Sequence, residues 1–364
     1  MRLDRQYAAR KEDLDAVVET VFTGGRVLQG PEVRLFEQAL AKTVELEHAV
    51  AVGSGTDALS LSMRALGLEP GGRVAVTSLS FVASASSIIH AGGIPLFVDV
   101  DDYYLSRLDT LEELIESQAI DGIILVHLYG QMLETQDICE KAQAKGIFVI
   151  EDAAQALGAT HADKPPGHFS DAACISFDPT KVIGAFGSGG SIVTHRKDMA
   201  EKCRCLRYHG QSKKGIYSEI GYNSQMHTVQ AAMLLEKLKY LNTWQEHRES
   251  IAARYNDAIA SLPKIQAPRI AEKNTHIYHK YVLRAGNDRD RLLEHLTKAG
   301  IGTAIHYATP LSKQPCFSGK AEITHGGCHK AEEAANEVLS LPIYPELQDE
   351  EVAYITEMLG KFFR

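Results

Sequence analysis

Between residues 47 and 194, short runs of apolar and β-branched residues alternate with segments in which apolar residues recur every three or four positions. The short runs are typical of strands buried on both faces, and the recurring spacing is typical of amphipathic helices. A chain that alternates strands with helices builds a mostly parallel sheet covered by helices. The sequence therefore predicts an α/β fold. The expected strands are 48–52, 73–77, 95–99, 122–126, 147–150, 173–177 and 191–194, and the expected helices are 57–66, 108–117 and 134–145.

The pattern changes after Met226. From residue 229 to about 261 the sequence is helical in character and contains no Gly or Pro to stop a helix, so it predicts one long helical stretch. A strand over 276–284, a helix over 288–299, a strand over 303–306 and two closing helices then indicate a separate α/β unit. We therefore expect a large domain over residues 1–240 and a smaller C-terminal domain over residues 241–364.

Charge and hydropathy narrow the classes of partner. The chain has 364 residues, with 38 Lys and Arg against 47 Asp and Glu, and its net charge of −9 disfavours binding to nucleic acid or anionic lipid. No apolar run reaches the ~18 residues of a membrane span, and the polar N-terminal residues lack a signal-peptide core. We expect a cytoplasmic protein without a membrane partner. Six cysteines in a chain of this length are too few for a disulfide scaffold, so most of them are expected to be packing residues. No cluster of ligands suggests a metal site.

A glycine turn follows the first expected strand. Gly53-Ser54-Gly55-Thr56-Asp57-Ala58 fits the G-x-G-x-x-(G/A) pattern of dinucleotide-binding turns. Any strand, glycine turn and helix N-terminus offers free N–H groups to an anion, so the pattern predicts a phosphate more generally. An NAD site also needs a carboxylate at the end of the next strand, where this chain has Val76-Thr77-Ser78. A single phosphate is favoured, and an NAD-dependent oxidoreductase stays open as an alternative.

A carboxylate and a lysine follow two later strands. Asp152 ends the apolar run 147–150, and Lys181 follows Ser176 after the next strand, so both are expected at the carboxyl edge of the sheet. Lys181 taken alone resembles a solvated loop lysine. Together with a phosphate-binding turn, however, the pair points to pyridoxal 5′-phosphate. This cofactor needs a lysine for its Schiff base and an anion to keep its ring nitrogen protonated.

Several motifs occur in one order along the chain: Gly30-Pro31-Glu32-Val33, Gly55-Thr56-Asp57-Ala58-Leu59, Glu151-Asp152-Ala153-Ala154-Gln155, Ser176-Phe177 with Lys181, Gly221-Tyr222-Asn223-Ser224, and His306-Tyr307. In these motifs the whole chain resembles the nucleotide-sugar aminotransferases of the DegT/DnrJ/EryC1/StrS family. The resemblance implies an aspartate-aminotransferase-like fold, fold type I, with a large domain and a small C-terminal domain. It also implies a pyridoxal 5′-phosphate-dependent enzyme.

The resemblance implies a role for each matching residue. Lys181 would form the Schiff base, Asp152 would pair with the ring nitrogen, and Gln155 and Phe81 would lie at the ring hydroxyl and the ring face. The expected phosphate ligands are the Gly55 backbone, Thr56, Ser176 and, from a neighbouring subunit, Asn223. Shared sites of this kind imply a homodimer. Judged without the resemblance, Phe81 fits a core aromatic, Asn223 a turn residue and Ser176 a bonded core hydroxyl.

Three further positions bear on the substrate. His306 and Tyr307 resemble substrate-binding residues of the family, and Gln225 stands where relatives acting on 3-keto uronic acids carry an Arg. A neutral Gln is a poor partner for a carboxylate, so the sequence favours a neutral keto sugar over a uronate. Lys181 is itself informative, because a branch of the family with His in its place consists of dehydratases. Its presence favours transamination.

The sequence therefore predicts an aminotransferase that moves an amino group from an amino acid, expected to be L-glutamate, to a keto group of a nucleotide-linked sugar. The amino sugar is expected to serve a surface polysaccharide such as lipopolysaccharide, or a related glycan. Two alternatives remain: an NAD-dependent oxidoreductase built on the glycine turn, and a protein that binds pyridoxal 5′-phosphate as a sensor without turnover.

Overall fold

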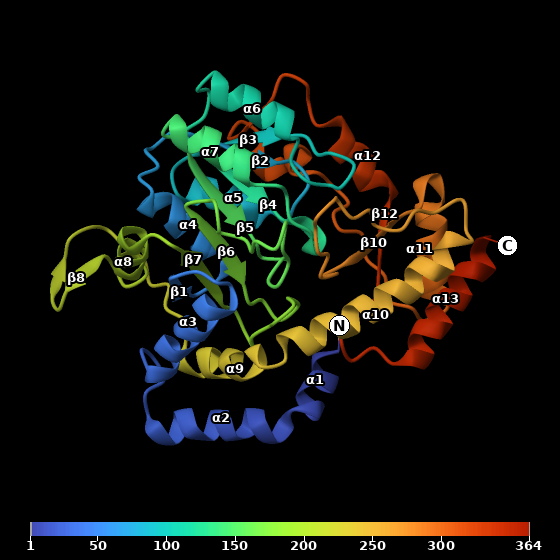
Figure 1. The fold of residues 1–364 in the computed structure, drawn as a ribbon, viewed down its shortest axis with the longest axis horizontal. Coiled ribbons are helices and arrows are strands. Elements are labelled where there is room, and N and C mark those ends of the chain that lie inside the picture. Colours follow the sequence, from blue (N-terminus) through green and yellow to red (C-terminus); the bar gives the residue numbers. More distant parts are fainter. Residues whose placement is uncertain (1, 364) are drawn as a thin grey trace.

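The computed structural model describes residues 2–363 and has a large sheet at its centre (Figure 1). This sheet has eight strands in the order β1-β7-β6-β5-β4-β2-β3-β11. In this order, the six strands from β6 to β11 run parallel to one another, whereas β7 is antiparallel to both of its neighbours, β1 and β6. The bounds are β1 (His48–Val52), β2 (Arg73–Thr77), β3 (Ile94–Val98), β4 (Gly122–Val126), β5 (Phe148–Asp152), β6 (Ala172–Ser176), β7 (Gly190–Thr194) and β11 (Glu322–Ile323).

Helices surround this sheet and confirm the expected α/β fold. The three helices expected between strands occur as α4, α6 and α7, each within two residues of the expected bounds. The helices that precede residue 210 are α1 (Leu3–Ala9), α2 (Lys11–Gly24), α3 (Pro31–Thr43), α4 (Gly55–Ala65), α5 (Ala83–His90), α6 (Leu108–Glu116), α7 (Gln136–Ala144) and α8 (Lys197–Leu206).

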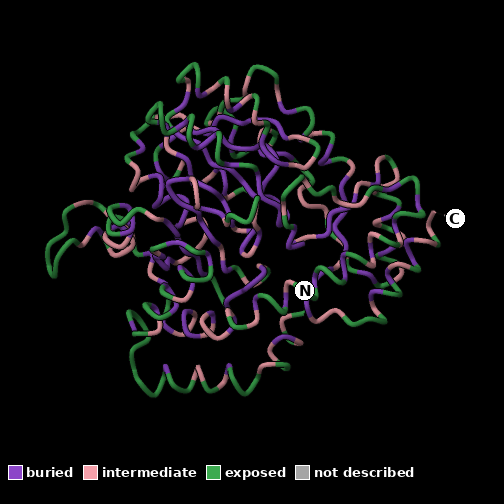
Figure 2. The backbone as a smooth tube through the Cα atoms, viewed as in Figure 1, coloured by how far each residue is buried: buried purple, intermediate pink, exposed green. Residues whose placement is uncertain are grey.

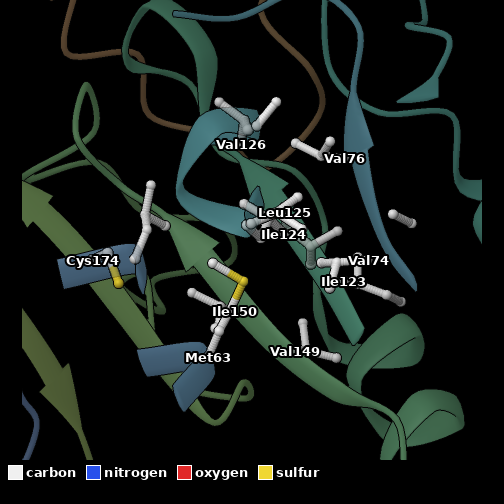
Figure 3. Close-up of a cluster of buried hydrophobic side chains, with 14 of the residues drawn as sticks. Met63, Val74, Val76, Ile123, Ile124, Leu125, Val126, Val149, Ile150 and Cys174 are labelled. Atoms are coloured by element: carbon white, nitrogen blue, oxygen red, sulfur yellow. The ribbon is translucent and has the colours of Figure 1, made fainter. Parts of the chain in front are cut away.

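The sheet is buried on both faces. Along β1, Ala49 and Ala51 belong to the apolar cluster that contains residues of α3, while Val50 and Val52 belong to the cluster that contains residues of α4. Figure 3 shows the second cluster, with Met63 of α4 beside side chains of β4 and β5. Successive side chains of a strand point to opposite faces, so continuous apolar runs are the pattern that this two-sided burial requires.

The helical stretch expected from residue 229 to about 261 is confirmed, but it is not one uninterrupted helix. The stretch forms α9 (Thr228–Leu238) and α10 (Leu241–Ala260), separated at Lys239 and Tyr240. The amide of Lys239 donates to Glu236 O at 3.3 Å and that of Tyr240 to Lys237 O at 3.0 Å, so each bond reaches back only three residues. Bonds of this length tighten the end of a helix. The break lets α9 pack against α2 and α3 while α10 packs against α13 (Asp349–Phe363). Tertiary packing therefore sets the position of the break, and no Gly or Pro in the sequence marks it.

The C-terminal part has its own two-stranded sheet, in which β10 (Tyr281–Arg284) pairs antiparallel with β12 (Val338–Leu341). The strand expected over 303–306 is wrong, because only Ala304 forms a bridge, to Ser340. Residues of α11 (Arg289–Lys298), α10 and α13 bury a third apolar cluster with these strands.

The same part of the chain also returns to the large sheet. β11 lies parallel to β3, and α12 (His329–Glu337) contributes Ala331 and Ala334 to the cluster shown in Figure 3. This return brings residues after 300 to the edge where the strands of the large sheet end. The domain boundary expected near residue 240 stays a prediction.

A two-stranded hairpin, β8 (Gln211–Lys213) and β9 (Ile216–Tyr217), extends from the body of the molecule (Figure 1). Figure 2 shows this hairpin as exposed along most of its length. Over residues 2–363, none of the helices combines the length and the apolar character needed to cross a bilayer.

Candidate active site

A cavity of about 420 Å³ lies where β5 and β6 end and α4 begins. Parallel strands of an open α/β sheet bring their carboxyl ends to one edge, which is where such folds bind ligands. All the site residues expected from the sequence, except Asn223 and Gln225, line this cavity. They are Gly55, Thr56, Phe81, Asp152, Gln155, Ser176, Lys181, His306 and Tyr307.

Lys181 lies in the loop after β6, and its amide donates to Asp178 O at 2.9 Å. Its side chain is half-buried and lines the cavity. Burial lowers the pKa of Lys181, while the carboxylates of Asp152 and Asp178 act in the opposite direction. A lysine with a lowered pKa has a larger neutral fraction at pH 7, and only the neutral amine is a nucleophile or a proton acceptor.

Asp152 is the last residue of β5 and is 5% exposed. Ser84 Oγ donates to its Oδ2 at 2.7 Å, and the amide of Ala154 donates to its Oδ1 at 3.2 Å. Ser80 Oγ lies 2.7 Å from Ser84 Oγ and continues this chain of hydroxyls. The carboxylate is thus held in one orientation inside the cavity.

Glu151, the neighbour of Asp152, points the other way. Its Oε2 lies 2.5 Å from Nε2 of His127, and both side chains are fully buried. His127 Nδ1 accepts from the amide of Leu133 at 3.1 Å, which assigns its proton to Nε2 and makes Glu151 the acceptor. Of the two adjacent carboxylates, only Asp152 is therefore available to a ligand in the cavity.

The N-terminus of α4 forms a donor pocket on another side of the cavity. Ser54 Oγ accepts from the amide of Asp57 at 3.0 Å and caps the helix. The amides of Gly55 and Thr56 have no hydrogen-bond acceptor within residues 2–363. A Cβ on Gly55 would lie 2.8 Å from the Cβ of Ser176, so only glycine lets the Ser176 hydroxyl approach these amides. Free amides, a hydroxyl and a helix dipole together suit a phosphate.

Gln155 connects the cavity to residues from the C-terminal part. Its Oε1 accepts from the amide of Tyr129 at 3.0 Å, and its Nε2 donates to the hydroxyl of Tyr307 at 3.2 Å. Tyr129 in turn donates its hydroxyl to the carbonyl of His306. Phe81 also lines the cavity, is 52% exposed, and has its ring centroid 6.3 Å from that of Tyr307.

These groups fit pyridoxal 5′-phosphate. They supply a lysine, a fixed carboxylate, a donor pocket for a phosphate and an exposed aromatic ring within one cavity. The carboxylate and the phosphate pocket lie at the ends of different elements, β5 and α4, as a ligand with a basic ring nitrogen and a phosphate requires.

Sequence reasoning missed several cavity residues. Ser80 and Ser84, which lie on either side of Phe81 in the sequence, are two of them, and hydroxyls repeated within five residues beside an expected site residue were the available signal. His279 and Lys280 were included only in an expected strand, yet both line the cavity. A basic pair within an apolar strand pattern was the available signal.

Asn223 and Gln225 lie outside the cavity of their own chain. Between them, Ser224 is buried, and it accepts the amide of Gly53 at 3.2 Å on its carbonyl. Neighbouring residues of an extended segment point to opposite sides, so Asn223 and Gln225 both point away from the side on which Ser224 is buried. Asn223 is exposed, and Gln225 Oε1 accepts a hydrogen bond from Gln29 Nε2 at 2.6 Å. Their expected place in a neighbouring subunit's site stays a prediction.

Comparison with known families places residues 8–360 in the DegT/DnrJ/EryC1/StrS aminotransferase family. Among relatives, the chain is 37% identical to a pleiotropic regulatory protein of Geobacillus stearothermophilus, covering 100% of this chain and 97% of the relative. It is 37% identical to dTDP-3-amino-3,4,6-trideoxy-α-D-glucose transaminase of Streptomyces venezuelae, with coverages of 95% and 91%. It is 35% identical to UDP-2-acetamido-2-deoxy-3-oxo-D-glucuronate aminotransferase of Pseudomonas aeruginosa, covering 98% of each chain.

Two crystal structures extend the comparison. A DegT/DnrJ/EryC1/StrS aminotransferase from Brucella abortus superposes with a TM-score of 0.94 at 32% identity, covering 100% of this chain and 98% of that chain. NtdA from Bacillus subtilis, crystallised with bound cofactor PMP, superposes with a TM-score of 0.87 at 30% identity, with coverages of 98% and 82%. The fold-type-I architecture expected from the sequence is confirmed.

Proposed function

The chain belongs to the DegT/DnrJ/EryC1/StrS aminotransferase family, and we propose that it transfers the amino group of L-glutamate to a keto group on a nucleotide-linked sugar. The named transaminases among its relatives act on sugars linked to a nucleotide, which supports the substrate class. The observation that carries the proposal is the single cavity in which Lys181, Asp152 and the phosphate pocket meet. We infer that the product serves a surface polysaccharide or a related glycan.

The cofactor is pyridoxal 5′-phosphate, in line with a relative that binds PMP, its aminated form. When bound, this group acts as an electron sink that lets a proton leave the carbon bearing the amino group. In our proposal Gly55, Thr56 and Ser176 hold its phosphate, and Asp152 holds the proton on its ring nitrogen. Gln155 and Phe81 would orient the ring.

Lys181 would move the proton. Its amine lies in the cavity with Asp152 and Asp178, and burial lowers its pKa. A general base works best when its pKa lies near the working pH, because it must both accept and return the proton. We infer that Lys181 Nζ takes the proton from the donor carbon in the first half-reaction. In the second, it would deliver a proton to the sugar carbon that receives the amino group.

We further propose that the active unit is a homodimer in which Asn223 reaches the phosphate of the neighbouring subunit. Asn223 is exposed, and it precedes Ser224, which is fixed against the glycine turn by two contacts, with Gly53 and with Asp57. Large apolar side chains are exposed on α2, on α3, on the segment between these helices and in the hairpin region, and an interface would cover them. They are Phe22, Val27, Leu28, Leu35, Ile216, Tyr217 and Ile220.

An absorbance titration tests the proposed function. The purified protein with its cofactor should show a band near the visible edge that shifts when L-glutamate is added and returns when a nucleotide-linked keto sugar follows. A band that does not change when glutamate is added would favour a sensor without turnover. The Geobacillus relative is named a pleiotropic regulatory protein, which is consistent with such a role. Absence of any band would contradict the cofactor assignment.

A further inference from the structure

A second lysine, Lys280, lines the active-site cavity together with Lys181. It directly precedes β10 and is held in place by its own amide, which donates to Tyr129 O at 3.2 Å. Its side chain is half-buried. Lys280 therefore adds a second, partly buried lysine side chain to the lining of the cavity.

The carboxylates near Lys280 are engaged elsewhere. Asp152 is held by Ser84 and the amide of Ala154, and its position suits the cofactor ring. Asp178 accepts from the amide of Thr180 at 3.0 Å and from its hydroxyl at 2.8 Å. Within residues 2–363, no carboxylate forms a hydrogen bond with Lys280 Nζ. Burying an ammonium group without a counterion costs free energy, because the group loses part of its hydration. A bound anion would offset that cost.

Two histidines, His279 and His306, line the cavity together with Lys280 and support a ligand site on this wall. His279 is 3% exposed, and its Nδ1 is buried without a hydrogen-bond partner within residues 2–363. His306 also lines the cavity and lies 2.8 Å from Ser340 Oγ through its Nδ1. Burial lowers the pKa of His279 far below its usual range and that of His306 to about 4, with Lys280 adding to both shifts. Both imidazoles are therefore neutral at pH 7. Burial and the nearby Lys181 lower the pKa of Lys280 to about 8, so Lys280 is still mostly protonated at pH 7 and supplies the charge on this wall.

The geometry points to Lys280 as a specificity-determining residue that binds a carboxylate of the substrate, with His279 and His306 as neutral neighbours. This inference rests on the proposed function, which supplies two sources of a carboxylate: the amino donor and a uronate sugar. One ammonium group beside neutral imidazoles matches the single charge of a carboxylate. The cofactor's phosphate has its own donors at the N-terminus of α4.

A binding experiment tests the carboxylate site without relying on turnover. Glutarate carries the carboxylates of glutamate but no amine, so its Kd for the cofactor-loaded enzyme, measured by calorimetry, reports recognition alone. Lys280→Met should raise this Kd about 10- to 100-fold, because a charge-assisted hydrogen bond is lost. Lys280→Arg should restore part of the affinity. Lys264→Met, which removes an exposed lysine outside the cavity, should leave the Kd unchanged.

Two further arms identify the source of the carboxylate. The Kd for L-glutamate is read from the absorbance change without sugar, and the KM is measured for a neutral and a uronate keto sugar. An increase in Lys280→Met that is confined to glutamate assigns the donor, and one confined to the uronate assigns the sugar. Either result supports the site.

Three results would overturn the inference. The first is a wild-type enzyme that binds neither glutarate nor a uronate keto sugar, and the second is Kd and KM values in Lys280→Met within about twofold of wild type. The third is loss of the cofactor band in both Lys280→Met and Lys280→Gln, which would assign Lys280 to the cofactor. Glutarate binding that depends on Lys280 in a protein that aminates no keto sugar would contradict the proposed function alone.

Discussion

The cavity has two unlike walls. The wall formed by the large sheet places its polar groups at strand ends and helix starts. The backbone of α4 fixes the free amides of Gly55 and Thr56, and hydrogen bonds through Ser80 and Ser84 fix the carboxylate of Asp152. The wall formed by the C-terminal part presents His279, Lys280, His306 and Tyr307. There, an imidazole nitrogen and an ammonium group lack protein partners within residues 2–363.

This difference separates two tasks. A wall whose amides and carboxylate are held in place by the backbone and by hydrogen bonds keeps a resident cofactor in one geometry, because little must reorganise when it binds. A wall with unpaired groups recognises what arrives and leaves, because a substrate then satisfies groups that are otherwise left without partners. We therefore expect substitutions in the first wall to affect the chemical step and substitutions in the second to affect substrate affinity.

The largest expected effect is at Lys181. Lys181→Ala should lower kcat by about four orders of magnitude or more, since it removes both the attachment point and the proton carrier. The melting temperature should stay close to that of wild type, because a cavity lysine contributes chemistry and little packing. Single-turnover absorbance with L-glutamate gives the rate, and Lys264→Ala is the control. A variant that keeps a rate near that of wild type would contradict the assignment.

Asp152→Asn should retain the cofactor and lower the rate by about 10²- to 10³-fold, because a neutral amide no longer holds the proton on the ring nitrogen. The KM for the sugar should change little if the two walls act separately. Stopped-flow absorbance measures the rate, and fluorescence measures cofactor content. An unchanged rate would count against the role of Asp152, and a change confined to KM would break the distinction between the walls.

A third contribution is expected from the neighbouring subunit. Mixing Lys181→Ala with Asn223→Ala protomers, each inactive alone, should restore about a quarter of wild-type activity, because half the dimers are mixed and each has one intact site. Activity is measured after subunit exchange has been verified by mass spectrometry. If exchanged dimers stay inactive, the site is built within one chain.

The smallest expected effect is at Gln225, which sharpens the assignment of the substrate. Without an Arg partner a uronate loses charge-assisted bonds, so the wild type should prefer a neutral keto sugar, and Gln225→Arg should narrow or invert that preference by about tenfold. The comparison is kcat/KM for a neutral and a uronate nucleotide-linked keto sugar. A wild type that prefers the uronate would contradict this prediction and would leave Lys280 as a partner for the sugar carboxylate.

Much of the fold follows from the sequence, because buried strands need apolar runs. The expected bounds 48–52, 73–77 and 122–126 agree with β1, β2 and β4. The break between α9 and α10 was not predictable in the same way. Lys239 and Tyr240 are compatible with a helix, and the chain bends there because two different packing surfaces lie on either side.

The candidate site divides along the same line. The sequence by itself determined the wall at the sheet edge, because strand ends and a glycine turn are local patterns that place Asp152, Ser176 and Gly55 together. Only the tertiary structure decided that Asp152 faces the cavity while Glu151 pairs with His127, since alternation gives two faces and packing chooses which one is open. It also decided the second wall. The local sequence pattern predicts only that His279 and Lys280 belong to a strand. They line the same cavity as Lys181 because the C-terminal part folds back over the edge of the sheet.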